Sequence, residues 1–353
     1  MSYELNEKIK NLVPYEPISG NFDIRLDANE CTFNYTPELF SMVHDVVDNL
    51  DFNRYPDPTC TELRKSFAQF YGIDNKNVTV GNGSDELIFL IESAFLQKGE
   101  KLLVAAPDFS MYEFYGSISE NPCLKYFKNN ELNIDVDRLI SKVNDEDIKL
   151  LIFSNPCNPT GQGINKKDCV KLLNSVDSLV VLDEAYMDFW SSDESFIKDV
   201  NSYDNLIVFR TASKALGSAA LRLGFAVANE RISKAIAAVK SPYNVNSLSQ
   251  AIGAKLYRNK DFLTNRINTI VKNTDLLYNE LVRIGKKTED FTVYPTKTNF
   301  VFIKTSFGKE LWEYLKSNSI AIRYMGDYIR ITSGSDEENT KVINTIKNFI
   351  SEN

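Results

Sequence analysis

Histidine is almost absent from this chain, whose 353 residues contain only His44. A Ser-His-Asp triad or a multi-histidine metal site would have to be built on that single side chain. His44 lies in an amphipathic helical pattern over residues 40–47, which favours a surface histidine or one with an ordinary hydrogen-bond partner. The sequence therefore disfavours triad hydrolases and histidine-based metal centres, and we expect no metal.

Cysteine is scarce and scattered: there are five, with no C-x-x-C pair. This pattern favours reduced thiols in a cytoplasm over a disulfide frame or a zinc site. The first residues are polar and charged, without the apolar core of a signal peptide, and no apolar run is long enough to span a bilayer. We expect a cytoplasmic protein that does not engage a membrane.

Positive charge is also in deficit, because the net charge is −8. Such a chain does not attract nucleic acid non-specifically, and a phosphorylated ligand would have to be bound by local basic groups. A hydrophobic content of 43% and a charged content of 25% are those of a globular protein. The length allows two domains, or one large domain with a smaller one.

Short apolar runs alternate with amphipathic helical patterns between about Thr36 and Ala238. This alternation predicts an α/β domain with a mostly parallel sheet covered on both faces. One long amphipathic helix is expected from about Ser247 to Arg283, followed by a small α+β domain. We therefore expect an N-terminal arm (1–35), a large domain (36–240) and a small C-terminal domain (241–353). The expected strands of the large domain are residues 78–80, 102–104, 150–153, 179–182, 206–209 and 224–227.

A lysine, Lys214, stands between small and hydroxylic residues and is flanked by apolar runs. Partial desolvation would favour its free amine, which can act as a nucleophile toward an aldehyde cofactor. Thr211, Ser213 and Arg222 are then candidate phosphate ligands, since a guanidinium donates two parallel charge-assisted hydrogen bonds. On spacing alone, an exposed lysine in a turn between strands is an equally good interpretation.

A glycine-rich turn, Gly81 to Glu86, follows one expected strand and opens a helix. The backbone N–H groups near Gly83, Ser84 and Asp85 can form an anion site at the helix N-terminus. A plain strand-to-helix turn needs the same residue types. Phe109, after the next strand, can stack on a flat ring or belong to the core.

Two further strand ends carry polar residues. Asn158 lies in Asn155-Pro156-Cys157-Asn158-Pro159-Thr160-Gly161, an irregular extended turn in which it can donate to an oxygen anion. Asp183 and Tyr186 follow another strand, and a carboxylate leaving a buried strand needs a cation. Asp183 with Glu184 could instead hold magnesium, but no P-loop lysine motif accompanies them.

The lysine motif, Thr211-Ala212-Ser213-Lys214 followed by Leu221-Arg222-Leu223-Gly224, resembles that of fold-type I aminotransferases, which use pyridoxal 5'-phosphate (PLP). The other motifs occur in that family's order from about residue 26 to 332. The resemblance implies a fold-type I PLP-transferase in which Lys214 holds the cofactor and moves the substrate proton. It also implies that Asp183 meets the pyridine nitrogen, Asn158 and Tyr186 meet the phenolate, and Phe109 covers the ring.

The same resemblance implies the partners of the site. Tyr55, in Arg54-Tyr55-Pro56-Asp57-Pro58, matches a family tyrosine that reaches the cofactor phosphate of the neighbouring subunit, which predicts a homodimer. Arg330 matches the family's ligand for the substrate carboxylate. Tyr15, Asn29 and Tyr55 are further candidates for contact with small-molecule amino-acid or keto-acid substrates, and Arg323 is a second basic candidate.

Within the family, several stretches resemble histidinol-phosphate aminotransferases, among them Leu26-Asp27-Ala28-Asn29-Glu30 and Gly81-Asn82-Gly83-Ser84-Asp85-Glu86. The resemblance to that subgroup implies transfer of the amino group of L-histidinol phosphate to 2-oxoglutarate, which gives imidazole-acetol phosphate and L-glutamate, in histidine biosynthesis. Cys31-Thr32 replaces the usual Asn-Pro, and Ala220 replaces a common glycine. The alternatives are a threonine-phosphate decarboxylase, an aromatic amino-acid aminotransferase and a PLP-binding regulatory homologue.

Overall fold

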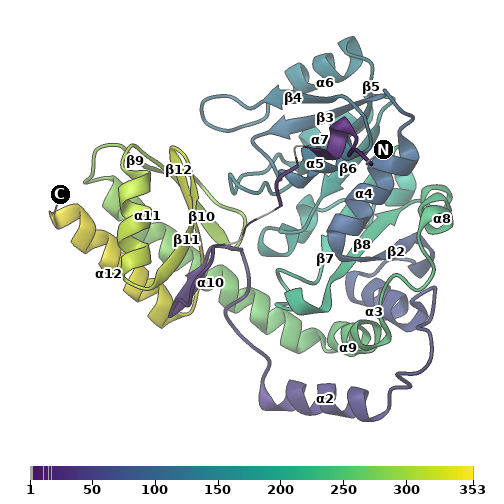
Figure 1. Ribbon diagram of the computed structural model, residues 1–353, viewed down its shortest axis with the longest axis horizontal. Coiled ribbons are helices and arrows are strands. Elements are labelled where there is room, and N and C mark those ends of the chain that lie inside the picture. Colours follow the sequence, from purple (N-terminus) through teal and green to yellow (C-terminus); the bar gives the residue numbers. More distant parts are fainter. Residues whose placement is uncertain (1–2, 11, 15, 17, 353) are drawn as a thin grey trace.

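The computed structural model describes residues 3–10, 12–14, 16 and 18–352. Figure 1 shows a large unit built on a seven-stranded sheet and a smaller unit built on a five-stranded sheet. The long helix α10 (Lys260–Gly285) runs between them. No helix in the described ranges has both the length and the apolar character needed to cross a membrane.

The seven-stranded sheet is mostly parallel, as the alternating pattern predicted. Its strand order is β2-β8-β7-β6-β5-β3-β4, and β8 runs antiparallel to both of its neighbours while the remaining pairs are parallel. The edge strand β4 was not foreseen. The bounds are β2 (Val78–Asn82), β3 (Lys101–Ala106), β4 (Cys123–Phe127), β5 (Ile148–Ser154), β6 (Leu179–Asp183), β7 (Leu206–Thr211) and β8 (Leu223–Ala228).

Both faces of this sheet are buried, which explains its continuous apolar runs. Along β7, Leu206 and Val208 pack into one hydrophobic cluster, whereas Ile207 and Phe209 pack into another on the opposite face. This is the two-residue period of a strand. The helices of this unit are α2 (Pro37–Asp48), α3 (Thr61–Tyr71), α4 (Gly83–Phe95), α5 (Met111–Ile118), α6 (Val136–Asp145), α7 (Lys166–Leu173), α8 (Glu230–Val239) and α9 (Ser247–Arg258).

The five-stranded sheet has the order β1-β11-β12-β10-β9. Its edge strand β1 (Ile24–Leu26) comes from the expected N-terminal arm and pairs in parallel with β11 (Ile320–Met325). The segment before the large unit is thereby fastened to the C-terminal unit. The other elements are β9 (Phe291–Val293), β10 (Phe300–Thr305), β12 (Tyr328–Thr332), α11 (Gly308–Ser317) and α12 (Asp336–Glu352).

The single helix expected between residues 247 and 283 is two helices, α9 and α10. They meet at Asn259, whose backbone (φ −90°, ψ 72°) is not helical and whose side chain accepts from the N–H of Phe262 at 3.3 Å. A side chain that caps the next helix competes with continuation of the previous one. The division into residues 1–35, 36–240 and 241–353 stays a prediction. The short helical segments are α1 (Glu7–Lys10), η1 (Asn75–Asn77), η2 (Met187–Phe189), η3 (Ser192–Glu194), η4 (Val200–Ser202) and η5 (Ala219–Leu221).

Candidate active site

The carboxyl ends of β5, β6 and β7 lie side by side in the sheet, and the loops that follow them carry Asn158, Asp183 and Lys214. The Nζ of Lys214 donates to the carbonyl of Ala28 at 3.1 Å and lies 5.9 Å from the ring centroid of Tyr186. Burial, followed by the positive charge of Arg330, lowers the pKa of Lys214 to about 8. A substantial fraction of this amine is therefore uncharged near neutral pH.

Asp183 ends β6 and is buried, at 4% exposure. Its carboxylate accepts from the Tyr112 hydroxyl at 2.7 Å and from the backbone N–H of Ala185 at 3.0 Å, two neutral donors. Burial raises the pKa of Asp183 to about 6, against the lowering effect of the Tyr112 hydrogen bond. A buried carboxylate with neutral donors is stabilised further by a cation.

Tyr186 joins the two units of the protein. Its hydroxyl accepts from Nδ2 of Asn29 at 2.9 Å, and the backbone N–H of Asn29 donates to the Thr332 hydroxyl on β12 at 3.0 Å. Asn29 is 1% exposed and has a positive φ of 54°. Burial raises the pKa of Tyr186 to about 12, so its hydroxyl keeps its proton and can donate.

Arg330 also crosses between the units. One guanidinium nitrogen donates to Oδ1 of Asn158 at 2.5 Å, and the other donates to the carbonyl of Asp27 at 2.8 Å. Arg323 on β11 is its cross-strand partner.

The start of α4 lies against β8 and Arg222. A Cβ added to Gly224 would lie 2.4 Å from backbone atoms of Gly83 and Ser84, so only glycine allows this approach. Gly83 has a positive φ of 80°, and a Cβ there would lie 2.6 Å from a guanidinium nitrogen of Arg222. Arg222 pairs with Asp85 at 3.0 Å. The helix N-terminus and the guanidinium thus converge on one place, as an anion site requires.

Two hydroxyls and one ring border this region. Thr211 and Ser213 are buried, and their hydroxyl oxygens lie 3.1 Å apart. Phe109 lies in the loop after β3 and makes an edge contact with Tyr112, with ring centroids 5.6 Å apart. The same Tyr112 bonds Asp183, so Phe109 and the β6 carboxylate share a neighbour.

One expected residue, Tyr55, lies on the surface, and another, Tyr15, is not among the described residues. Tyr55 is 81% exposed and stacks on Tyr243 with ring centroids 4.6 Å apart.

Asp183 and Glu184 do not form a magnesium site. Successive side chains of a strand point to opposite faces, and Glu184 pairs with Arg210 at 2.8 Å on the face away from Tyr112. Arg210 also pairs with Asp188 at 2.8 Å. Within the described ranges, no group of three or more His, Cys, Asp or Glu side chains is placed to hold a metal ion.

Sequence reasoning missed Tyr112 and the Glu184–Arg210–Asp188 network. Tyr112 lies 71 residues before Asp183, and Arg210 lies 26 residues after Glu184. Nothing local marks such contacts, because strand order brings them together. The available sequence signal for the network was Arg210, a charged residue that directly follows the apolar run of residues 206–209.

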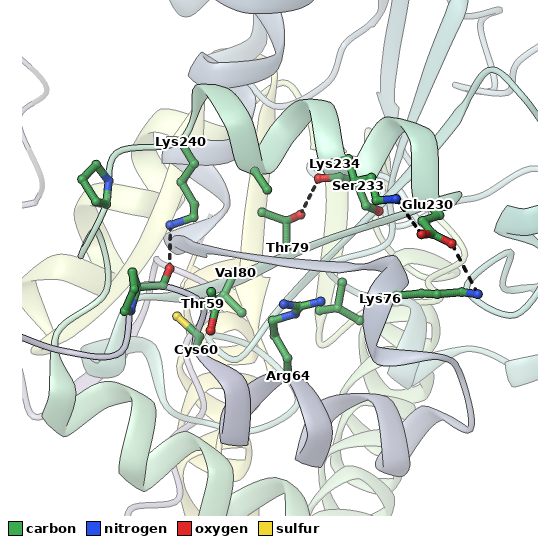
Figure 2. Close-up of a pocket in the computed structure, with 14 residues that line it drawn as sticks. Thr59, Cys60, Arg64, Lys76, Thr79, Val80, Glu230, Ser233, Lys234 and Lys240 are labelled. Carbon is green, nitrogen blue, oxygen red and sulfur yellow. Dashed lines mark hydrogen bonds and ion pairs between the residues drawn. The ribbon is translucent and has the colours of Figure 1, made fainter.

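A cavity of about 420 Å³ lies between α3, β2 and α8 (Figure 2). Its basic side chains already have partners: Lys76 and Lys234 pair with Glu230, and Lys240 donates to the carbonyl of Pro58 at 3.2 Å. None of the side chains expected in the active site lines it. The candidate active site is therefore the carboxyl edge of the sheet rather than this cavity.

The residues at that edge fit PLP. The tight approach of Gly83 and Gly224, where an added Cβ would collide, suits a phosphate. The buried carboxylate of Asp183, with its neutral donors, suits a protonated ring nitrogen. The amine of Lys214, with its lowered pKa, suits an aldehyde. The family model "Aminotransferase class I and II" matches residues 23–346. The chain belongs to the class I and II aminotransferases. It is thus a PLP-dependent transferase.

The chain is also similar to individual proteins. The chain is 43% identical to a histidinol-phosphate aminotransferase of Clostridium novyi, with 98% of each chain covered. The crystal structure of a histidinol-phosphate aminotransferase from Sinorhizobium meliloti in complex with pyridoxal-5'-phosphate is similar, with a TM-score of 0.88 and 21% identity over 99% of this chain and 98% of that one. An L-threonine-O-3-phosphate decarboxylase from Porphyromonas gingivalis has a TM-score of 0.79 and 26% identity, covering 93% and 99%.

Proposed function

We propose that this aminotransferase passes the amino group of L-histidinol phosphate to 2-oxoglutarate, giving imidazole-acetol phosphate and L-glutamate in histidine biosynthesis. The full-length likeness to histidinol-phosphate aminotransferases supports this substrate. The placement of Lys214, with its lowered pKa, beside the buried carboxylate of Asp183 supports the chemistry most directly. When bound, PLP withdraws electrons from the substrate's Cα and so makes its proton acidic.

Lys214 is then the base that takes the Cα proton and returns it at the other carbon. Its pKa of about 8 matches that task, since an amine that titrates near the working pH both accepts and donates. Asp183 holds the proton of the ring nitrogen, while Asn158 and Tyr186 donate to the ring oxygen. Gly83, Ser84, Asp85, Thr211, Ser213 and Arg222 form the phosphate cradle, and Phe109 covers the ring.

Arg330 binds the anionic group of each substrate. Histidinol phosphate carries a phosphate ester where glutamate carries its α-carboxylate, and a guanidinium donates in parallel to either. The hydrogen bond of Arg330 to Asn158, a residue of the proposed cofactor site, supports this role. Asn29 is already bonded to Tyr186, which supports an indirect role for it through that hydroxyl.

The substrate is tested by steady-state turnover of PLP-loaded protein. With 2-oxoglutarate as acceptor, L-histidinol phosphate should give glutamate with a kcat/KM at least about a hundredfold above that for phenylalanine or tyrosine, because those lack the phosphate. Release of carbon dioxide from threonine phosphate would support the decarboxylase instead. PLP binding without turnover of any of these would support a regulatory homologue.

We further propose a homodimer in the cytoplasm, with Tyr55 completing the partner's phosphate cradle. The exposed Tyr55–Tyr243 stack supports the dimer, because large exposed aromatic side chains mark interfaces. Mixing Lys214→Ala with Tyr55→Ala subunits should restore about one quarter of wild-type activity, since half of the dimers would hold one intact site. The control mixture, Lys214→Ala with Asp183→Ala, should restore none because both residues belong to one chain's site. No recovery in the first mixture, with subunit exchange verified, would contradict the shared site.

A further inference from the structure

A buried ammonium group lies behind the loops that carry Phe109 and Asn158. Lys128 follows the edge strand β4, and its side chain is only 2% exposed. Its Nζ donates to the carbonyl of Pro107 at 2.7 Å and to the sulfur of Cys157 at 2.9 Å. It also lies 3.8 Å from Oδ2 of Asp108, whose side chain is likewise 2% exposed. The cation therefore touches both the loop after β3 and the loop after β5.

Besides pairing with Lys128, the carboxylate of Asp108 accepts hydrogen bonds from two backbone N–H groups and one hydroxyl. Its carboxylate accepts from the backbone N–H of Phe109 at 2.8 Å and from that of Ser154 at 3.2 Å. It also accepts from the Ser154 hydroxyl. Burial raises the pKa of Asp108, and the charge of Lys128 opposes that rise. The ion pair thus favours the ionised carboxylate, which is the form that can accept several hydrogen bonds.

The Ser154 hydroxyl connects Asp108 to Asn158 through two hydrogen bonds. Because the serine hydroxyl donates to Asp108, its oxygen is left to accept, and the backbone N–H of Asn158 donates to it at 3.0 Å. The result is a continuous path from Lys128 through Asp108 to two residues of the proposed cofactor site. One branch reaches Phe109 directly, and the other reaches Asn158 through Ser154.

We propose that Lys128 is a positioning residue for the cofactor: its ammonium holds Asp108 so that Phe109 is placed to cover the ring and Asn158 is placed to reach the ring oxygen. This inference rests on the proposed roles of those two residues and not on the identity of the substrate. Lys128 itself touches neither cofactor nor substrate. Its contribution appears in how the cofactor is bound and in the electronic state of its ring oxygen, to which Asn158 donates.

The test replaces Lys128 by methionine and measures PLP itself. Removing the cation leaves the Asp108 carboxylate buried and uncompensated, which displaces its hydrogen-bond donors. We expect Lys128→Met to raise the dissociation constant for PLP about tenfold, the effect of weakening one or two hydrogen bonds. The pH at which the visible absorption of the bound cofactor changes should move by about half a unit or more, since a weakened donor at a phenolate shifts its titration.

Two controls separate positioning from general damage. Lys128→Arg keeps the cation and should restore most of the affinity and the spectral titration. Lys125→Met removes a cation three residues earlier, within β4, that forms an exposed pair with Glu113 at 2.8 Å, and it should change neither the affinity nor the titration. Folded Lys128→Met protein with wild-type PLP affinity and an unshifted titration would overturn the proposal.

If Lys128→Met does not fold, Asp108→Asn provides the second route. It preserves shape but removes the charge that Lys128 holds, and it should likewise shift the spectral titration by about half a pH unit or more. A folded Asp108→Asn protein with an unshifted titration overturns the proposal as well. Wild-type protein that fails to bind PLP would instead contradict the proposed function, so the two failures are distinguishable.

Discussion

Glu92 provides a quantitative test of the packing around α4, the helix whose N-terminus belongs to the proposed phosphate cradle. It lies on α4, is fully buried, and neither of its carboxylate oxygens has a hydrogen-bond partner in the part of the chain that the structure describes. Its neighbours include Gly116 on α5, where an added Cβ would lie 3.7 Å from Oε2. Burial raises the pKa of Glu92 from its ordinary 4.5 to about 9, so the folded protein holds this carboxyl protonated at neutral pH.

The sign and size of the effect follow from proton linkage. An acid whose folded pKa is raised gives full stability below its unfolded pKa, and stability falls as pH rises toward the folded value. Each pH unit in that window costs about 1.4 kcal/mol, so Glu92 lowers the free energy of unfolding by about 3 kcal/mol at pH 7. With about 2.1 cal/mol/K of unfolding entropy per residue, this corresponds to about 4 °C in Tm.

Glu92→Gln removes the titration while keeping a neutral group of similar shape. We expect it to raise Tm by about 4 °C at pH 7 and by about 1 °C at pH 5, measured by thermal denaturation across this range. The exposed Glu289→Gln is the matched control and should leave Tm unchanged at both pH values. A Glu92→Gln difference that is the same at pH 5 and pH 8 would refute the reasoning.

Three further predictions concern the site. Lys214→Ala should still bind PLP in an equilibrium dialysis experiment but lose turnover by at least about ten-thousandfold, as removal of a nucleophile and base does; near-normal turnover would refute its role. Arg330→Met removes a positive charge that lowers the Lys214 pKa, so amine labelling of Lys214, followed by mass spectrometry, should require a higher pH, and an unchanged profile would contradict that coupling. Arg210→Met leaves Glu184 and Asp188 without their buried cation and should cost about 3–5 kcal/mol in urea denaturation, whereas a loss below about 1 kcal/mol would show that the network is dispensable.

The central strands were predictable because both faces of the sheet are buried. A strand such as β7 is apolar at every position from Leu206 to Phe209, which makes it visible without any tertiary information. The edge strand β4 was missed because Cys123-Leu124-Lys125-Tyr126-Phe127 is partly exposed and mixes polar with apolar residues. The short β1 was missed since its three residues gain stability only by pairing with β11, about 300 positions later.

Some residues of the candidate site could likewise be predicted from the sequence, and others could not. Lys214, Asp183 and Asn158 each follow an apolar run, so the chain itself places them at the carboxyl edge of the sheet. Tyr112 and Lys128 could not be selected, because each is recognised only by its partner: Asp183 at the end of β6, 71 residues away, and Asp108 in the loop after β3, 20 residues away. The roles assigned to individual residues stay predictions until variants are measured.

The most direct measurement of the central claim is a half-reaction without any keto acid. PLP-loaded protein is mixed with L-histidinol phosphate, and the visible absorption spectrum is recorded over time. The account predicts loss of the absorption of the aldehyde form of the cofactor and a matching gain of that of its amine form, with imidazole-acetol phosphate released in a one-to-one ratio to active sites. No spectral change with L-histidinol phosphate, alongside conversion by phenylalanine or carbon dioxide release from threonine phosphate, would contradict it.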